Sequence, residues 1–218
     1  MEKTFESEWF IDINGDRIQN ANKNLILHVA IDLFSQDGYN AVSIRDITRK
    51  VGIKESSLYN HFSNKIEILE TIYFNFRMDV ANIIPPQEGL DEIVSSMDIE
   101  RFLIQGLKNF MDHIENPKME KIWRIIYLEQ VRDEKARSIY LNDIVEGMSN
   151  FMEIVFKKYF TLGQIQYHDP KMLSVNYQYP LLQMVSLYIL KRLDGEKTTE
   201  IEQNMMEHIR FFVGIVRV

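Results

Sequence analysis

Apolar residues recur three or four positions apart along most of this chain, and that spacing predicts helices almost throughout. Ile26, Ala30 and Phe34, for example, share one face of a helix expected at about residues 18–36, and Gly38 ends the run. Alternation of apolar and polar residues, the pattern of half-buried strands, is hard to find, and the 218 residues include only nine glycines and five prolines. The sequence therefore predicts an all-α protein that is long enough to bury a substantial core.

Capping signals divide the N-terminal third of the chain into short helices. Ser43 and Asp46 have the spacing of a capping box, which predicts a helix that begins at Ser43 and ends at Gly52. A second short helix is expected at about 54–61, and Asn64 starts a longer one that runs to about residue 82. Beyond a proline-containing break we expect helices at about 98–115, 118–131, 134–160, 170–192 and 198–216.

Two short helices joined by a glycine turn, after a longer support helix, form a helix-turn-helix unit. In the second of them, helical spacing turns Ile53, Leu58 and Phe62 inward. The side chains left outside are Ser56, Ser57, Tyr59 and Asn60. Such side chains fit the roughly 12 Å major groove of DNA and offer donors and acceptors to bases and phosphates. A helical hairpin with no DNA partner is the alternative interpretation of these residues alone.

The charge of the chain allows a local nucleic-acid footprint. Its formal net charge is -7, but residues 45–65 carry five basic side chains against Asp46 and Glu55. The basic residues are Arg45, Arg49, Lys50, Lys54 and Lys65. Residues 1–17 instead form an acidic arm whose five carboxylates would repel phosphates. We expect this arm to be disordered or folded back on the protein.

Two adjacent stretches carry a family resemblance: LILHVAIDLFSQDGYNAV and, directly after it, SIRDITRKVGIKESSLYNHFSNKIEIL. Over about residues 22–70, they closely resemble the N-terminal DNA-binding domain of TetR-type transcriptional regulators. The matching residues are Ala30, Phe34, Gly38, Tyr39, Ser43 to Ile47, Val51 to Ile53, Leu58, Tyr59, His61, Phe62 and Lys65. The chain departs at two positions, since Lys54 stands where the family usually has a capping Ser or Thr, and Ser56 where it commonly has glycine.

The resemblance implies an architecture and a set of DNA contacts. The implied fold is a three-helix helix-turn-helix DNA-binding domain at residues 18–65, followed at residues 66–218 by a larger helical domain for effector binding and dimerisation. Carried over residue by residue, the DNA-contacting set is Ser43, Arg45, Lys54, Ser56, Ser57, Tyr59, Asn60, His61 and Lys65. Lys65 would bind a phosphate at the start of the following helix, beside free backbone N–H groups. His61 is equally compatible with packing between helices.

The larger domain is rich in aromatic and methionine side chains, which a helical core explains without any ligand. The resemblance to ligand-responsive repressors implies instead that some of them enclose an apolar cavity for a small-molecule effector. The candidate pocket residues are Phe102, Gln105, Trp123, Tyr127, Tyr177 and Met184. We expect the helices at about 170–192 and 198–216 to pair two copies into a homodimer, with Pro180 either bending the first helix or marking its true beginning.

Catalysis finds little support in the sequence. The five histidines lie in separate elements, and HExxH, GxSxG and phosphate-loop patterns are missing, so we expect neither an enzyme nor a metal or other cofactor. No signal-peptide pattern opens the chain, and no apolar run reaches the ~20 residues of a membrane span. We therefore expect a cytoplasmic protein without a membrane partner.

Three hypotheses remain. The first is a repressor that a small molecule releases from a palindromic DNA operator. The second is a DNA-binding regulator of the same fold that responds to a protein partner or to no effector. The third is a helical enzyme, which would need converging titratable groups that the sequence does not show.

Overall fold

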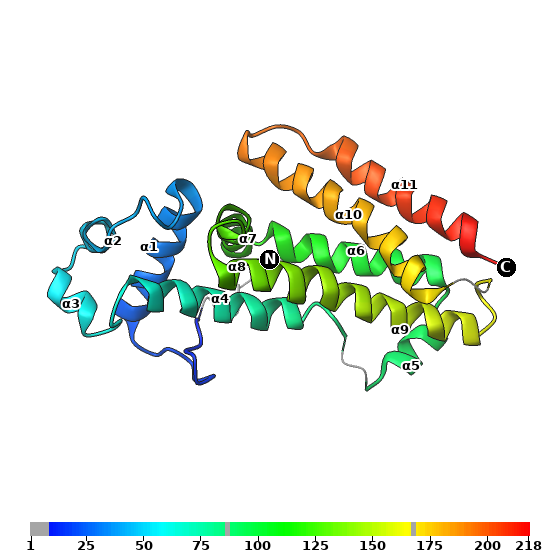
Figure 1. Ribbon diagram of the computed structural model, residues 1–218, viewed down its shortest axis with the longest axis horizontal. Helices are drawn as coiled ribbons and strands as arrows, with labels where there is room; N and C mark the ends of the chain where they lie inside the picture. The colour runs from blue at the N-terminus through cyan, green and yellow to red at the C-terminus, as the bar shows by residue number, and fades with distance from the viewer. Residues whose placement is uncertain (1–8, 86–87, 167–168) are drawn as a thin grey trace, which may run out of the picture. The chain divides into compact units, whose positions relative to one another are not determined.

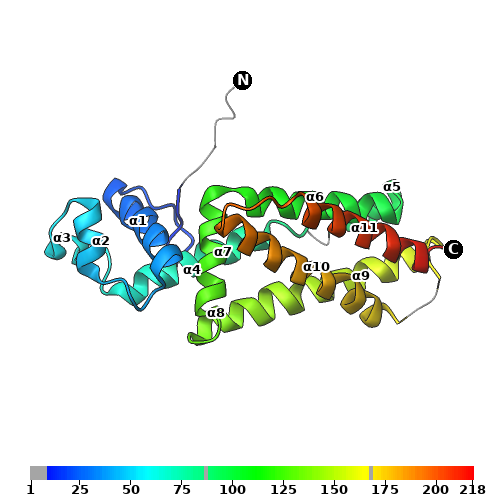
Figure 2. The ribbon, with the colours of Figure 1, turned by 90° about the horizontal axis from the view of Figure 1, so that it is seen from above.

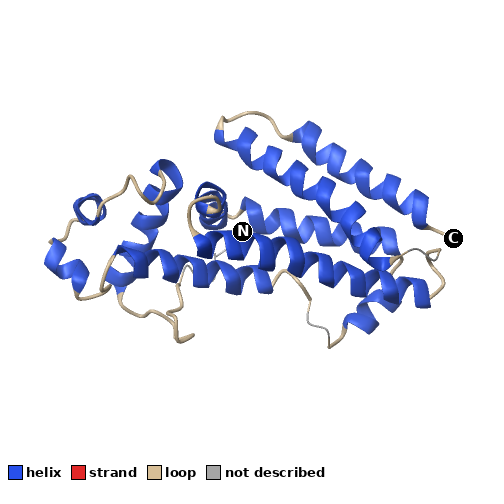
Figure 3. Ribbon diagram, in the orientation of Figure 1, coloured by secondary structure: helices blue, strands red, loops and turns tan. Residues whose placement is uncertain are grey.

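The computed structural model of the chain describes residues 9–85, 88–166 and 169–218, and the regular elements within these ranges are helices (Figure 3). The predicted all-α fold is thereby confirmed. The chain divides into two compact units, one of residues 1–81 with 116–140 and one of residues 82–115 with 141–218. Among the described helices, none combines the length and the apolar character that crossing a membrane requires.

The first unit is built around α1 (Figures 1 and 2). Its helices are α1 (Ala21–Asp37), α2 (Ile44–Val51), α3 (Glu55–Tyr59), α4 (Lys65–Ala81), α7 (Pro117–Glu129) and α8 (Glu134–Ser138). Helix α1 packs against α2, α4 and α7, and Ile26, Ala30 and Phe34 are fully buried as their spacing predicts. Phe76 of α4 meets Trp123 of α7 edge to face, with ring centroids 5.0 Å apart. Aromatic packing therefore holds α4 and α7 together inside this unit.

The predicted capping signals are confirmed around the helix-turn-helix. The Ser43 hydroxyl accepts the Asp46 N–H at 3.2 Å, and the Asp46 carboxylate accepts the Ser43 N–H at 3.0 Å. Gly52 ends α2 with φ 83° and ψ 29°, a left-handed conformation that favours glycine. Asn64 caps α4 by accepting the Glu67 N–H at 2.9 Å.

Residues 9–18, which we call the N-terminal turn, fold back onto the first unit, one of the two alternatives expected for the acidic arm. Residues 1–8 of that arm lie outside the described chain. The Ile18 N–H donates to the Phe10 carbonyl at 2.8 Å and closes the turn. Phe10 is fully buried, with its ring edge against His28 of α1 and its centroid 5.2 Å from the Lys118 ammonium of α7. One aromatic side chain thus reaches both α1 and α7.

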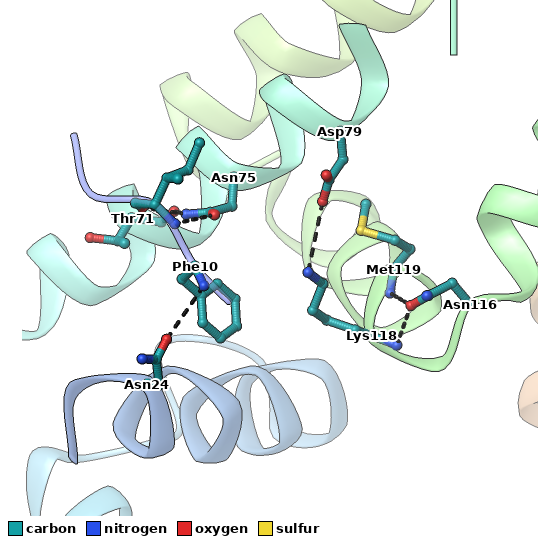
Figure 4. Close-up of polar contacts among 9 residues, drawn as sticks. Phe10, Asn24, Thr71, Asn75, Asp79, Asn116, Lys118 and Met119 are labelled. Carbon is teal, nitrogen blue, oxygen red and sulfur yellow. Dashed lines mark hydrogen bonds and ion pairs between the residues drawn. The ribbon is translucent and has the colours of Figure 1, made fainter. Parts of the chain in front are cut away.

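Polar side chains fix the backbone of the N-terminal turn to two helices. Asn75 of α4 accepts the Ile11 N–H at 2.9 Å and donates to the Ile11 carbonyl at 2.8 Å. Asn24 of α1 accepts the Phe10 N–H at 3.3 Å and donates to the Ile18 carbonyl at 2.7 Å. Figure 4 shows Phe10 between these two asparagines. Two asparagines on neighbouring helices therefore hydrogen-bond to the backbone of the same short segment.

The second unit is a set of packed helices in which α10 and α11 lie side by side and α9 runs along α10 (Figures 1 and 2). Its helices are α5 (Leu90–Ser96), α6 (Ile99–Glu115), α9 (Gly147–Thr161), α10 (Pro170–Leu193) and α11 (Thr199–Val216). Phe156, Tyr177 and Phe212 form an aromatic cluster at centroid distances of 5.4 to 6.0 Å. This cluster joins α9, α10 and α11 into one core. Helix α5 is an element that the sequence analysis did not anticipate.

Helix α10 begins where the sequence indicates. Asp169 caps it by accepting the Lys171 N–H at 3.0 Å, and Pro170 takes the first helical position. Pro180 lies inside this continuous helix, so the alternative in which it marks the true beginning is wrong.

The helix expected at about 134–160 is not continuous. Its place is taken by α8, the π-helix η1 (Ile139–Glu146) and α9. The Gln178 side-chain amide of α10 donates to the carbonyls of Ile144 and Val145, at 3.3 and 3.0 Å. A Cβ on Gly147, where α9 begins, would lie 3.3 Å from a carbonyl oxygen of η1, so glycine suits this exit. The π segment thus has a hydrogen-bond partner on a helix distant in sequence, which a local pattern does not reveal.

Candidate DNA-binding interface

Helices α2 and α3 pack as a helix-turn-helix with an apolar interior. Ile47 of α2, Leu58 of α3 and Phe62 just beyond it are at most 1% exposed. Ile53, expected to face inward, is only partly buried in the turn. Helix α3 spans five residues, too few to be stable alone, so the buried Leu58 and Phe62 hold it in place.

The outer face of α3 presents the side chains that the helical spacing predicts. The exposed residues of α3 and its two caps are Lys54, Glu55, Ser56, Tyr59 and Asn60. Ser57 and His61 are partly buried at the edge of this face. A cation, two kinds of hydroxyl and an amide therefore stand on one short helix, where they offer donors and acceptors to the edges of bases and to phosphates.

Helix α2 adds basic side chains beside this face. The Ser43 hydroxyl is 2.6 Å from the Asp46 carboxylate, so the cap fixes its orientation. Arg45 and Lys50 are exposed, and Arg49 pairs with Asp46 at 2.8 Å while 76% of its side chain stays in solvent. Arg49 and Lys50 are not among the predicted DNA contacts, and the local excess of basic residues is the sequence signal that pointed to them.

Lys65 differs from the expected picture of a lysine free to bind phosphate. Its ammonium donates to the carbonyls of Tyr39 and Val42, at 2.9 and 2.7 Å, and lies 3.9 Å from the Tyr39 ring centroid. Burial lowers the pKa of Lys65, and the negative charge of Glu129 opposes this shift. The side chain ties α4 to residues 38–43, here called the α1–α2 turn, and its contact with phosphate stays a prediction.

A buried carboxylate, missed by the sequence analysis, holds the same turn. Glu129 ends α7, is 4% exposed, and accepts the Tyr39 N–H at 2.9 Å. Tyr73 of α4 is also buried, and its pKa is raised by burial first and then by the charges of Asp133 and Glu129. The Glu129 contact joins residues 90 positions apart, so no local sequence signal announces it.

The six candidate ligand residues divide between the two units. Trp123 and Tyr127 belong to the first unit, and Trp123 is buried in its core. The other four, Phe102, Gln105, Tyr177 and Met184, belong to the second unit. Phe102 and Tyr177 are buried in ring contacts, whereas Gln105 is exposed and donates to a neighbouring side chain at 2.8 Å. Packing in the core accounts for three of the six, and their role in ligand binding stays a prediction.

The N-terminal part of the chain matches a known family. Residues 26–72 match the model of the bacterial regulatory proteins of the tetR family. This range runs from α1 through α2 and α3 into α4, and it contains every residue predicted to contact DNA.

Two curated relatives and one solved structure extend this similarity. The biofilm operon icaADBC negative transcriptional regulator IcaR of Staphylococcus epidermidis is 35% identical over 89 residues, which cover 41% of this chain and 43% of that protein. IcaR of Staphylococcus aureus (strain Newman) is 28% identical over 184 residues, or 84% of this chain and 90% of that protein. The ketosteroid transcriptional regulator KstR2 of Mycobacterium tuberculosis shares the fold, with a TM-score of 0.63 and 20% identity over 91% of this chain and 96% of that one. These proteins are transcriptional regulators, not enzymes.

Proposed function

We propose that this chain is a TetR-family repressor which binds a palindromic DNA operator as a homodimer and is released by a small molecule. The observation that carries the proposal is the exposed polar face of α3 above the buried Leu58 and Phe62. The description of IcaR as a negative regulator supports repression rather than activation. Because the target is DNA, we place the protein in the cytoplasm.

Within this interface the side chains divide into two roles. Asn60 and Ser56 are short, exposed and polar, so we assign them to base edges in the major groove. Arg45 and Lys54 carry exposed charges, so we assign them to phosphates, which fix register without reading sequence. Tyr59 is 53% exposed, and its hydroxyl suits a phosphate at the edge of the groove.

The dimer would form through α10 and α11. Exposed apolar side chains follow one stripe of α10 and continue on α11. In a monomer these side chains would stay exposed to water. They are Met172, Tyr179, Leu187 and Leu190 on α10, and Phe211 and Ile215 on α11, with exposed fractions of 43% to 70%. Two copies related by a twofold axis would present two recognition helices, which matches a palindrome with half-sites roughly 34 Å apart.

A small-molecule effector is the finer part of the proposal, and the name of KstR2 supports it by linking a protein of this fold to ketosteroids. The alternative is a regulator of the same fold that answers to a protein partner or to no effector. One observation favours this alternative: Phe102 and Tyr177, two predicted pocket residues, already fill the core of the second unit.

Selection of duplexes from a random library, followed by fluorescence anisotropy, tests the DNA-binding part. Asn60→Ala should cost on the order of 1 to 3 kcal/mol on the selected operator and much less on a scrambled duplex, because it removes base reading only. Asn109→Ala is the matched control, since Asn109 is exposed on α6 in the other unit. Equal binding of operator and scrambled duplex by the unaltered protein would refute the assignment.

The effector is tested by linkage. A true inducer should weaken operator binding by about 5- to 150-fold, the range that a coupling of 1 to 3 kcal/mol produces, and operator DNA should weaken inducer binding by the same factor. A compound that binds tightly and leaves operator affinity unchanged is not the inducer. If a broad panel of compounds yields none, while a cellular protein shifts operator affinity, the alternative function is supported instead.

A further inference from the structure

We propose that Glu129 is a positioning residue for DNA recognition: its carboxylate sets the α1–α2 turn from which the DNA-reading helices begin. This inference rests on the proposed function, because it concerns the same DNA-binding face. Glu129 lies outside the predicted DNA-contacting set. It acts through Tyr39, which precedes the cap of α2 by four residues.

The burial of Glu129 is the first observation. Only 4% of the residue is exposed, although glutamate is almost never buried without a partner that compensates its lost hydration. The partner is a backbone group, the Tyr39 N–H at 2.9 Å. A carboxylate makes a stronger hydrogen bond to an N–H group than a neutral acceptor does. The buried carboxylate of Glu129 therefore holds the backbone of one turn residue, Tyr39, in place.

The second observation is that Tyr39 is held from both sides. Its N–H donates to Glu129 of α7, and its carbonyl accepts from the Lys65 ammonium of α4 at 2.9 Å. Lys65 also bonds the Val42 carbonyl at 2.7 Å, one residue before the Ser43 cap. An anion and a cation from two different helices thus fix the same short turn, and each of these bonds is strengthened by a partly dry environment.

The third observation is that two further contacts are made along this turn. Gly38 has φ 79°, and a Cβ at this position would lie 3.6 Å from the Glu129 carboxylate. The Tyr39 ring meets Phe34 edge to face at 5.3 Å. Because the turn is held at three points, a shift of the end of α7 would move the start of α2 and the α3 face that follows it. Glu129 is the contact through which α7 acts on the turn.

Two substitutions separate the position of the acceptor from its charge. Glu129→Gln keeps an oxygen at the same distance from the backbone but removes the charge. Glu129→Asp keeps the charge and withdraws the oxygen by one methylene. Glu134→Gln on α8, where the side chain is exposed, is the matched control for removal of a charge.

The assay measures dissociation constants on the selected operator and on a scrambled duplex, together with hydrogen exchange of a peptide that contains Tyr39. We expect Glu129→Asp to lower the operator-to-scrambled preference by at least about fivefold, the equivalent of one unsatisfied hydrogen bond, and to speed exchange at Tyr39. Glu129→Gln should lose less of the preference than Glu129→Asp, because its neutral oxygen still accepts the Tyr39 N–H at the same place, and the control should stay within about twofold of the unaltered protein.

Each other result overturns the proposal. If Glu129→Gln loses preference as much as Glu129→Asp, an acceptor oxygen at the right position is not sufficient, and the positioning role assigned to Glu129 is wrong. If both variants keep the preference, even with a lowered thermal midpoint, Glu129 only stabilises the fold. Failure of the unaltered protein to prefer the operator would instead defeat the proposed function, and this inference with it. That failure is recognised before any variant is measured.

Discussion

The N-terminal turn makes a prediction that the family match does not contain, because it lies before residue 26. Phe10 is fully buried against His28 and Lys118, and the bonds between Ile11 and Asn75 hold the adjacent backbone. Phe10→Ala removes the apolar anchor of this segment. The substitution should therefore destabilise the first unit, although it lies outside the helix-turn-helix itself.

The expected loss in the free energy of unfolding follows from the burial of Phe10. Replacing a fully buried phenylalanine with alanine typically costs about 3 to 5 kcal/mol, and the low end applies where neighbours can close the space. The turn is short and crosses the surface of the unit, so it can shift to close the space that the ring leaves. We therefore expect a loss of about 3 kcal/mol. Trp9→Ala is the control in the same segment. Trp9 is 45% exposed with the Arg17 guanidinium 4.0 Å from its ring, a contact worth about 0.5 to 1 kcal/mol at such a site.

Urea unfolding followed by far-ultraviolet circular dichroism measures both variants. All samples must have the same protein concentration, because the proposed dimer would make apparent stability depend on it. A midpoint that falls clearly for Phe10→Ala and little for Trp9→Ala supports a packed N-terminal turn. Equal and small losses for the two substitutions would refute the reasoning, since they would mean that the turn is not part of the core.

Three further predictions concern other contacts. Lys65→Ala should lower thermal stability, because the ammonium is bonded inside the α1–α2 turn; a salt slope of duplex binding smaller by about one per protomer would show that Lys65 also binds phosphate, and an unchanged slope would show that it does not. Leu187→Glu should give monomers by sedimentation at micromolar concentration, since Leu187 is 43% exposed and a charge there spares the fold; a persistent dimer would place the interface elsewhere. Gln178→Ala should cost about 1 to 3 kcal/mol in urea unfolding, because the carbonyls of Ile144 and Val145 lose their donor, and a neutral result would mean that η1 needs no such support.

The parts of the fold that the sequence predicted are those that local chemistry determines. The Ser43 capping box and the Asp169 start of α10 need only neighbouring residues, so their patterns carry over directly. The spacing within α3 likewise separates the buried Leu58 from the exposed Asn60. These are also the residues on which the DNA-binding assignment depends.

The parts that the sequence did not predict depend on distant partners. The ammonium of Lys65 reaches the carbonyl of Tyr39, 26 positions away, and nothing in its helix distinguishes it from a lysine in solvent. Glu129 is the last residue of α7, where a charged side chain is ordinarily expected in water. The π-helix accepts its long-range hydrogen bonds from Gln178 of α10. Aromatic content gave no better guidance to a ligand site, because the same side chains fill the core.

The short length of α3 should make DNA binding sensitive to temperature. A helix of five residues without a side-chain cap at Lys54 has almost no stability of its own, and Leu58 and Phe62 supply what holds it. A short helix of this kind can unfold in local fluctuations that leave the long helices intact. We therefore expect α3 to open at a lower temperature than the long helices, so that warming should weaken DNA binding while most of the circular dichroism signal remains.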